Sequence, residues 1–123
     1  MSKQATQENE QLTDAMFYIL LALLEERYGY VIMKYIEELS DGMMQMGPWT
    51  LYTLLKKLTK LQWIQQLTSD SRTKTYLITQ EGKRILCQEV KRRERMVEDA
   101  NKALKKGIVW RKKEKRNKYY AEV

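Results

Sequence analysis

The spacing of apolar residues predicts two helices near the start of the chain, after a polar arm over residues 1–12. The first covers about residues 13–26 and is apolar nearly all round, so neighbouring elements must cover more than one of its sides. Gly29 interrupts the pattern, and a second helix is predicted over about residues 30–39. The Ser-Asp-Gly run at 40–42 predicts its end, because glycine suits a left-handed C-terminal cap.

A third predicted helix, residues 48–61, has one apolar face and one basic face. Its apolar residues recur at helical spacing: Leu51, Leu54, Leu55, Leu58 and Leu61. The other face carries hydroxyls and amines without an acidic residue: Thr50, Thr53, Lys56, Lys57 and Lys60. Such a helix fits the major groove of DNA, with the threonines toward base edges or phosphates and the lysines toward phosphates. A solvated face on a core helix is the plainer alternative, and the helix by itself favours it.

After residue 61 the repeat of apolar residues shortens from the spacing of a helix to the alternation of a strand. Residues 63–68 and 73–78 are rich in β-branched and aromatic side chains, and the polar residues between them predict a hairpin. The hairpin tip carries Arg72, with Lys74 beside it. Three helices followed by a hairpin form the chain order of a winged helix-turn-helix, whose third helix enters the major groove. We therefore expect a mainly α fold with a small β-hairpin, the winged helix covering residues 13–79.

A long helix is predicted after Thr79, which suits its N-terminal cap, and it extends over residues 80–106. One narrow stripe of mostly apolar residues runs along this helix, as in helices that pair with one another, and we call it the dimer seam. A charged residue, Arg93, interrupts it. The seam consists of Leu86, Val90, Arg93, Val97, Ala100 and Leu104. Because so small a chain offers little surface to cover this seam, we expect a homodimer. Residues 107–123 form a basic tail with aromatic residues, which either contacts nucleic acid or packs on the partner subunit.

Composition narrows the classes of function. The net charge of +7 is concentrated in residues 105–123, a balance typical of nucleic-acid contact and equally of a solubilising tail. Without histidine and with Cys87 as the only cysteine, the chain has no Cys–His or Ser–His pair and no zinc motif, so we expect no enzymatic activity, cofactor or metal. The single cysteine and the lack of a secretory or membrane-spanning segment predict a cytoplasmic protein.

Five motifs carry a resemblance to a known family. They are Ile-Leu-Leu-Ala-Leu-Leu at 19–24, Tyr-Gly-Tyr-Val-Ile at 28–32, Thr-Leu-Tyr at 50–52, Trp-Ile at 63–64 and Thr-Tyr-Leu-Ile-Thr-Gln-Glu-Gly at 75–82. In this combination the chain resembles the PadR-like transcriptional regulators over about residues 13–90. The resemblance implies a homodimeric repressor that binds an inverted-repeat operator in double-stranded DNA, from the subgroup with one C-terminal dimerisation helix.

On this resemblance, one set of residues matches the recognition-helix positions that meet DNA: Thr50, Tyr52, Thr53, Lys56 and Lys57. Arg72 and Lys74 match the basic wing. Some relatives release DNA when an aromatic small molecule binds at the dimer interface, which makes such an effector a further expected partner.

The chain departs from the family pattern in three places. Trp49 stands where the family usually has a small residue, and the wing lacks the glycines and the arginine pair often found there. The long helix offers no aromatic side chain between Tyr76 and Trp110 to stack on a flat effector. Phe17, Tyr18 and Trp110 are the remaining candidates to line an effector site.

Two alternatives to a DNA-binding repressor stay open. The winged helix is then either a protein-interaction module, whose lysine face meets an acidic partner, or a ligand sensor that acts through a protein partner. A palindrome shared by genomic fragments that bind the purified protein favours the repressor, whereas non-specific retention favours the protein-interaction module.

Overall fold

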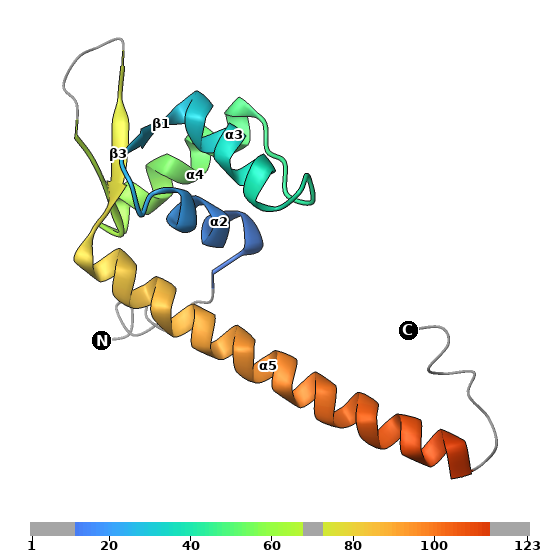
Figure 1. Ribbon diagram of the computed structural model, residues 1–123. Coiled ribbons are helices and arrows are strands. Elements are labelled where there is room, and N and C mark those ends of the chain that lie inside the picture. The colour runs from blue at the N-terminus through green and yellow to red at the C-terminus, as the bar shows by residue number, and fades with distance from the viewer. Residues whose placement is uncertain (1–11, 68–72, 114–123) are drawn as a thin grey trace. The chain divides into compact units, whose positions relative to one another are not determined.

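The structure is a computed structural model that describes residues 12–67 and 73–113, the side chains of 108–113 excepted (Figure 1). The chain divides into two compact units, residues 1–89 and 90–123. The elements are α2 (Asp14–Ala22), β1 (Arg27–Tyr28), α3 (Gly29–Leu39), α4 (Pro48–Lys60), β2 (Ile64–Gln66), β3 (Thr75–Ile78) and α5 (Gln80–Lys113). No helix within the described ranges is both long and apolar enough to cross a membrane.

Helix α2 is shorter than its apolar pattern predicts. Thr13 caps its start, where the Met16 amide donates to the threonine Oγ1 at 3.2 Å. The helix ends at Ala22 rather than near residue 26, and two interactions explain the early end. The Leu23 carbonyl accepts from the Ile78 amide of β3 at 2.8 Å, and the Arg27 guanidinium donates to the Ala22 carbonyl at 2.6 Å. The chain leaving α2 is therefore held at the sheet.

The hairpin is confirmed, but the sheet has a third strand that the sequence did not predict. Its order is β1-β3-β2, with both pairs antiparallel, so β3 is the central strand (Figure 1). Tyr28 of β1 pairs with Thr75, and Ile64 of β2 pairs with Ile78. A strand of two residues is too short to show an alternating pattern, so the sequence did not predict β1.

Helix α3 ends at Leu39, as the Ser-Asp-Gly signal predicts, although the cap differs in detail. Asp41 occupies the left-handed position at φ 53°, and Gly42 follows at φ 80°. The Gly42 amide donates to the Glu37 carbonyl at 2.8 Å and the Asp41 amide to the Glu38 carbonyl at 3.2 Å. This pair of bonds is the Schellman motif, with aspartate in the place that glycine usually takes.

One hydrophobic core holds the first unit together. Its largest fully buried side chains come from the first three helices, from the residue that follows α2 and from β2: Ile19, Leu20, Leu23, Ile32, Ile36, Leu51, Leu55, Leu58 and Ile64. The first turns of α5 close this core with Ile85 and Leu86. Leu86, assigned to the dimer seam from the sequence, is only 5% exposed within its own chain. It is a core residue, because the start of α5 packs on the winged helix.

A tight junction attaches α5 to the end of α4. Thr79 caps α5 as predicted, since its Oγ1 accepts from the Gly82 amide at 3.0 Å, and the same hydroxyl donates to the Gln62 carbonyl at 2.8 Å. The Thr79 amide donates to the Trp63 carbonyl at 2.9 Å. Gly82 is buried here, and a Cβ at this position would meet the Trp63 carbonyl oxygen at 2.0 Å. Only glycine fits.

The second unit, taken by itself, is a single helix as far as residue 113. It is longer than predicted, because α5 passes through Gly107 and ends at Lys113 rather than at residue 106. Residues 114–123 lie outside the described ranges. Met96 and Val97 are more than half exposed. A helix with apolar side chains open to water is typical of one that pairs with another surface.

Candidate nucleic-acid interface

Helix α4 holds the predicted basic face in place by burying the opposite one. Leu51, Leu55 and Leu58 are at most 1% exposed, so the helix cannot turn about its axis. It begins after Gly47, no side chain caps it, and its first turn contains no acidic residue. The partial positive charge of the helix N-terminus is therefore open to an approaching anion.

The polar face of α4 is exposed along its whole length. Its side chains are those predicted from the sequence: Thr50, Thr53, Lys56, Lys57 and Lys60. Among the described residues, no ion pair involves these three lysines. Their charges are therefore available to phosphates. The Thr53 hydroxyl donates to the Trp49 carbonyl at 2.8 Å, so its oxygen lone pairs and its methyl group are what remain for a ligand.

Tyr52 has a second role within the fold. Its ring is 48% exposed, but a Cβ added to Gly29 would lie 2.0 Å from its hydroxyl oxygen. The hydroxyl therefore lies against the first residue of α3. Burial raises the pKa of Tyr76 in β3, and the neighbouring Tyr52 adds to this rise. Tyr52 thus links α4 to α3 and to the sheet, and only part of its ring faces solvent.

The wing is described only in part. Lys74 lies just before β3 and is exposed, whereas Arg72 falls outside the described residues. The Leu67 amide donates to the Thr75 carbonyl at 2.9 Å, which extends the pairing of the hairpin beyond β2. The Thr75 hydroxyl donates to the Glu26 carboxylate at 2.6 Å, which fixes the base of the wing to the segment before β1.

Trp49 is an exposed residue of α4 that was not among the residues predicted to contact DNA. It is the second residue of α4 and is 80% exposed. The leucine spacing indicates this exposure, because residue 49 lies on the side of the helix opposite to the buried leucines.

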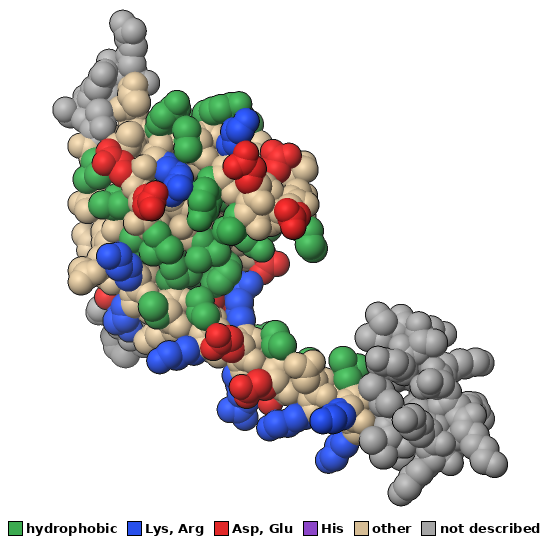
Figure 2. Space-filling view, viewed as in Figure 1, with side chains coloured by type: hydrophobic (Ala, Val, Ile, Leu, Met, Phe, Trp, Pro, Cys, Tyr) green, Lys and Arg blue, Asp and Glu red, His purple; other side chains and the backbone are tan. Residues whose placement is uncertain are grey.

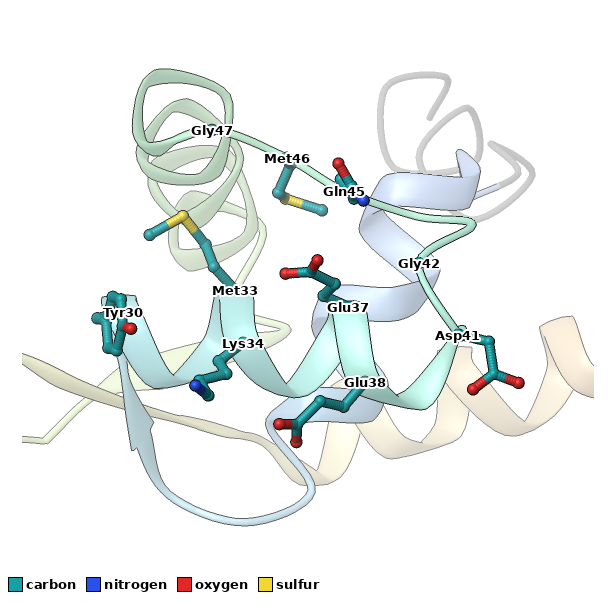
Figure 3. Close-up of a pocket in the computed structure, with 10 residues that line it drawn as sticks. All are labelled: Tyr30, Met33, Lys34, Glu37, Glu38, Asp41, Gly42, Gln45, Met46 and Gly47. Carbon is teal, nitrogen blue, oxygen red and sulfur yellow. The ribbon is translucent and has the colours of Figure 1, made fainter.

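An acidic hollow of about 1080 Å³ lies beside the start of α4 (Figure 3). It is formed by α3 and by the segment that joins α3 to α4, and its side chains include Met33, Glu37, Glu38, Asp41 and Met46. Acidic side chains also gather over the part of the surface formed by α3 (Figure 2). Carboxylates repel phosphates, so this side of the winged helix bounds the basic face. Within the described ranges, no group of three or more His, Cys, Asp or Glu side chains is arranged to hold a metal ion.

The remaining predicted site residues fall into two groups. Phe17 and Tyr18 form an edge-to-face pair, with ring centroids 5.9 Å apart, and pack partly buried against the core. Trp110 lies on α5, and its side chain is outside the described residues. On the second unit, Val97 and Ala100 are exposed, while Val90, Arg93 and Leu104 are half-buried. The effector site and the dimer seam stay predictions.

Comparison with known proteins identifies the family. The model of the PadR-like transcriptional regulators matches residues 19–88, which is more than half of the chain. The chain belongs to the PadR-like family. No curated protein matches it in sequence.

Solved structures agree with this assignment. RosR of H. salinarum, in the structure of its complex with S4, is 26% identical to this PadR-like chain, with a TM-score of 0.60 over 81% of this chain and 98% of that one. A PadR-family transcriptional regulator from Eggerthella lenta is 27% identical, with a TM-score of 0.54 over 70% and 72% of the two chains. A transcriptional regulator from Clostridium thermocellum, 24% identical, has the same fold, with a TM-score of 0.61 over 81% and 97%. This PadR-like chain is a winged-helix transcription regulator.

Proposed function

We propose that this chain is a sequence-specific repressor that binds an inverted repeat in double-stranded DNA as a homodimer. The observation that carries the proposal is the exposed face of α4, which has two threonines in its first half, three lysines in its second half and no acidic residue, and which follows an uncapped N-terminus. This combination supplies phosphate contacts from the lysines and leaves the first turns of the helix for base edges.

The dimer rests on the second unit. Met96 is 53% and Val97 58% exposed on a helix that, taken by itself, has no second element to cover them. A two-fold pairing of such helices buries the same patch on both copies and presents two copies of α4 related by a two-fold axis. The operator then has two half-sites in inverted orientation, and the spacing between them follows from the distance between the two α4 helices.

The first experiment selects genomic DNA fragments on the purified full-length protein and sequences those retained. We expect a shared inverted repeat. Binding to that repeat is then measured by fluorescence anisotropy over a range of salt concentrations. Because each phosphate contact contributes about 0.9 to the slope of log affinity against log salt, losing Lys56 and Lys57 flattens the slope by about 0.9 per contact removed.

The double variant Lys56→Ala, Lys57→Ala therefore binds more weakly and with a shallower salt dependence. Its matched control is Lys34→Ala, Lys83→Ala, which removes the same charge from exposed positions outside α4 and keeps the wild-type slope. Retained fragments without a common sequence, or equal slopes for the two double variants, would contradict the proposed function.

A further inference from the structure

Trp49 is the most exposed aromatic side chain among the large apolar residues open to solvent in the described ranges, at 80%. Single exposed apolar residues are ordinary on protein surfaces, so exposure alone does not indicate a role. What distinguishes this tryptophan is its position, at the second residue of α4. The N-terminal residues of a recognition helix are those that contact base edges in the major groove.

The indole lies at the head of the basic stripe. Trp49, Thr53 and Lys56 are spaced four and then three residues apart, so they share one face of α4, and Lys60 continues that face. The Thr53 hydroxyl donates to the Trp49 carbonyl at 2.8 Å within this first part of the helix. A duplex that meets the lysines of this stripe therefore also meets the indole.

The chemistry of the side chain indicates what it recognises. An indole is a flat apolar surface with one N–H donor and no acceptor. In the major groove the apolar group that distinguishes one base from the others is the 5-methyl group of thymine. We infer that Trp49 is a specificity-determining residue that packs on a thymine methyl group in each half-site of the operator. The inference rests on the proposed function and adds to it the base that α4 selects.

The lysines and the tryptophan then contribute to different properties of binding. Lysine contacts with phosphates act on every sequence alike, so they set affinity and its salt dependence. The indole contact acts only where a thymine methyl is present, so it sets sequence preference and leaves the salt dependence unchanged.

The test uses the selected operator and a set of operators in which one thymine at a time is replaced by deoxyuridine. This change removes the methyl group and keeps every hydrogen-bonding atom of the base. Burial of one methyl-sized group corresponds to about a fourfold change in affinity, so we expect about a fourfold loss for the wild-type protein at one thymine of each half-site.

Trp49→Ala is expected to bind the thymine operator more weakly than wild type and to show no loss at that deoxyuridine. Trp49→Phe keeps an apolar ring and therefore part of the discrimination. Leu39→Ala, which removes an apolar side chain that is 49% exposed at the end of α3, keeps the wild-type pattern at every position. Thermal unfolding of Trp49→Ala matches that of wild type, because the indole is exposed and alanine is the better helix former.

The possible outcomes are distinct. Equal losses of Trp49→Ala on thymine and deoxyuridine operators would show that the indole packs on the sugar–phosphate backbone, and wild-type binding by Trp49→Ala would show that it contacts no DNA. Either result overturns this inference and leaves the proposed function standing. A wild-type protein without any sequence preference overturns both.

Discussion

The hydroxyl group of Tyr52 lies against Gly29, so that a Cβ at residue 29 would meet its oxygen at 2.0 Å and its ring carbon Cζ at 2.7 Å. These two residues bring the first turn of α3 next to the helix that carries the basic face. Glycine at 29 serves this close approach rather than a special backbone conformation, since its φ is not positive, and any larger residue would have to displace the Tyr52 side chain. The contact sets how near α4 lies to α3.

Gly29→Ala is expected to destabilise the protein by about 1–3 kcal/mol, the usual cost of adding a methyl group to a filled site. The measurement is urea unfolding of the full-length protein, followed by circular dichroism. Tyr52→Phe in the same background removes the atom nearest the added methyl group and restores part of the loss. Gly47→Ala is the control, because no atom lies within 4 Å of its added Cβ. Equal midpoints for Gly29→Ala and Gly47→Ala would contradict the close contact.

Gly82→Ala is expected to be more damaging, at about 3 kcal/mol or more. The added Cβ would meet the Trp63 carbonyl oxygen at 2.0 Å and the Ile78 side chain at 2.7 Å. A backbone oxygen cannot rotate away as a tyrosine side chain can, and this carbonyl also accepts the Thr79 amide. Comparing the urea unfolding midpoints of Gly82→Ala and Gly29→Ala tests whether Gly82→Ala is the more destabilising of the two. A smaller shift for Gly82→Ala would mean that the junction between α4 and α5 is looser than the structure indicates.

The sequence predicted the parts of this fold that repeat a pattern over several turns. α4 was predicted to within a residue, because five leucines at helical spacing and a proline at the start leave little choice. The ends of elements were less predictable where tertiary contacts decide them. α2 stops at Ala22 because Arg27 takes up the Ala22 carbonyl and β3 takes up the Leu23 carbonyl, and the β3 partner lies more than 50 residues away in the sequence.

In the candidate site, too, some features follow from the local sequence pattern and others depend on tertiary contacts. The exposed lysines of α4 were predictable, since a face without apolar residues has nothing to bury. Leu86 was assigned from the sequence to the dimer seam, but it is 5% exposed and packs in the core of its own chain, because the first turns of α5 close that core while the apolar spacing along the helix hardly changes. The exposure of Trp49 follows from the same pattern, because residue 49 lies on the side of α4 opposite to its buried leucines.

Stability is expected to fall as pH rises above 10, through Tyr76. Burial of its ring raises the pKa of the phenol above the usual 10.0, with a further contribution from Tyr52. The unfolded chain then loses this proton at a lower pH than the folded one, so over that range the folded state binds more protons and the free energy of unfolding decreases. Tyr76→Phe has no proton to lose.

The check compares urea unfolding of wild type and Tyr76→Phe from pH 8 to 11. The wild-type midpoint should decline more steeply above pH 10 than that of the variant. Tyr30→Phe serves as control, because it removes a phenol at a position that is 62% exposed rather than buried. Parallel curves for wild type and Tyr76→Phe would remove Tyr76 as the cause.

The proposed dimer can be tested by a substitution in the second unit that does not disturb the fold of the first. Val97→Glu places a charge on an apolar side chain that is 58% exposed on α5. Burying an unpaired carboxylate between two helices costs several kcal/mol, roughly, so the variant should be largely monomeric at micromolar concentration by analytical ultracentrifugation. Because residue 97 lies outside the hydrophobic core of the first unit, the near-ultraviolet signal of that core should be unchanged.

Lys102→Gln is the matched control for this experiment. It changes the net charge by one unit in the same direction, at an exposed position on another side of the same helix. It should sediment as wild type does, while Val97→Glu should also lose affinity for the full inverted repeat and keep the weaker affinity for a single half-site. A monomeric wild-type protein, or a Val97→Glu variant that sediments as a dimer, would place the pairing surface elsewhere and would require a different explanation for the exposed seam of α5.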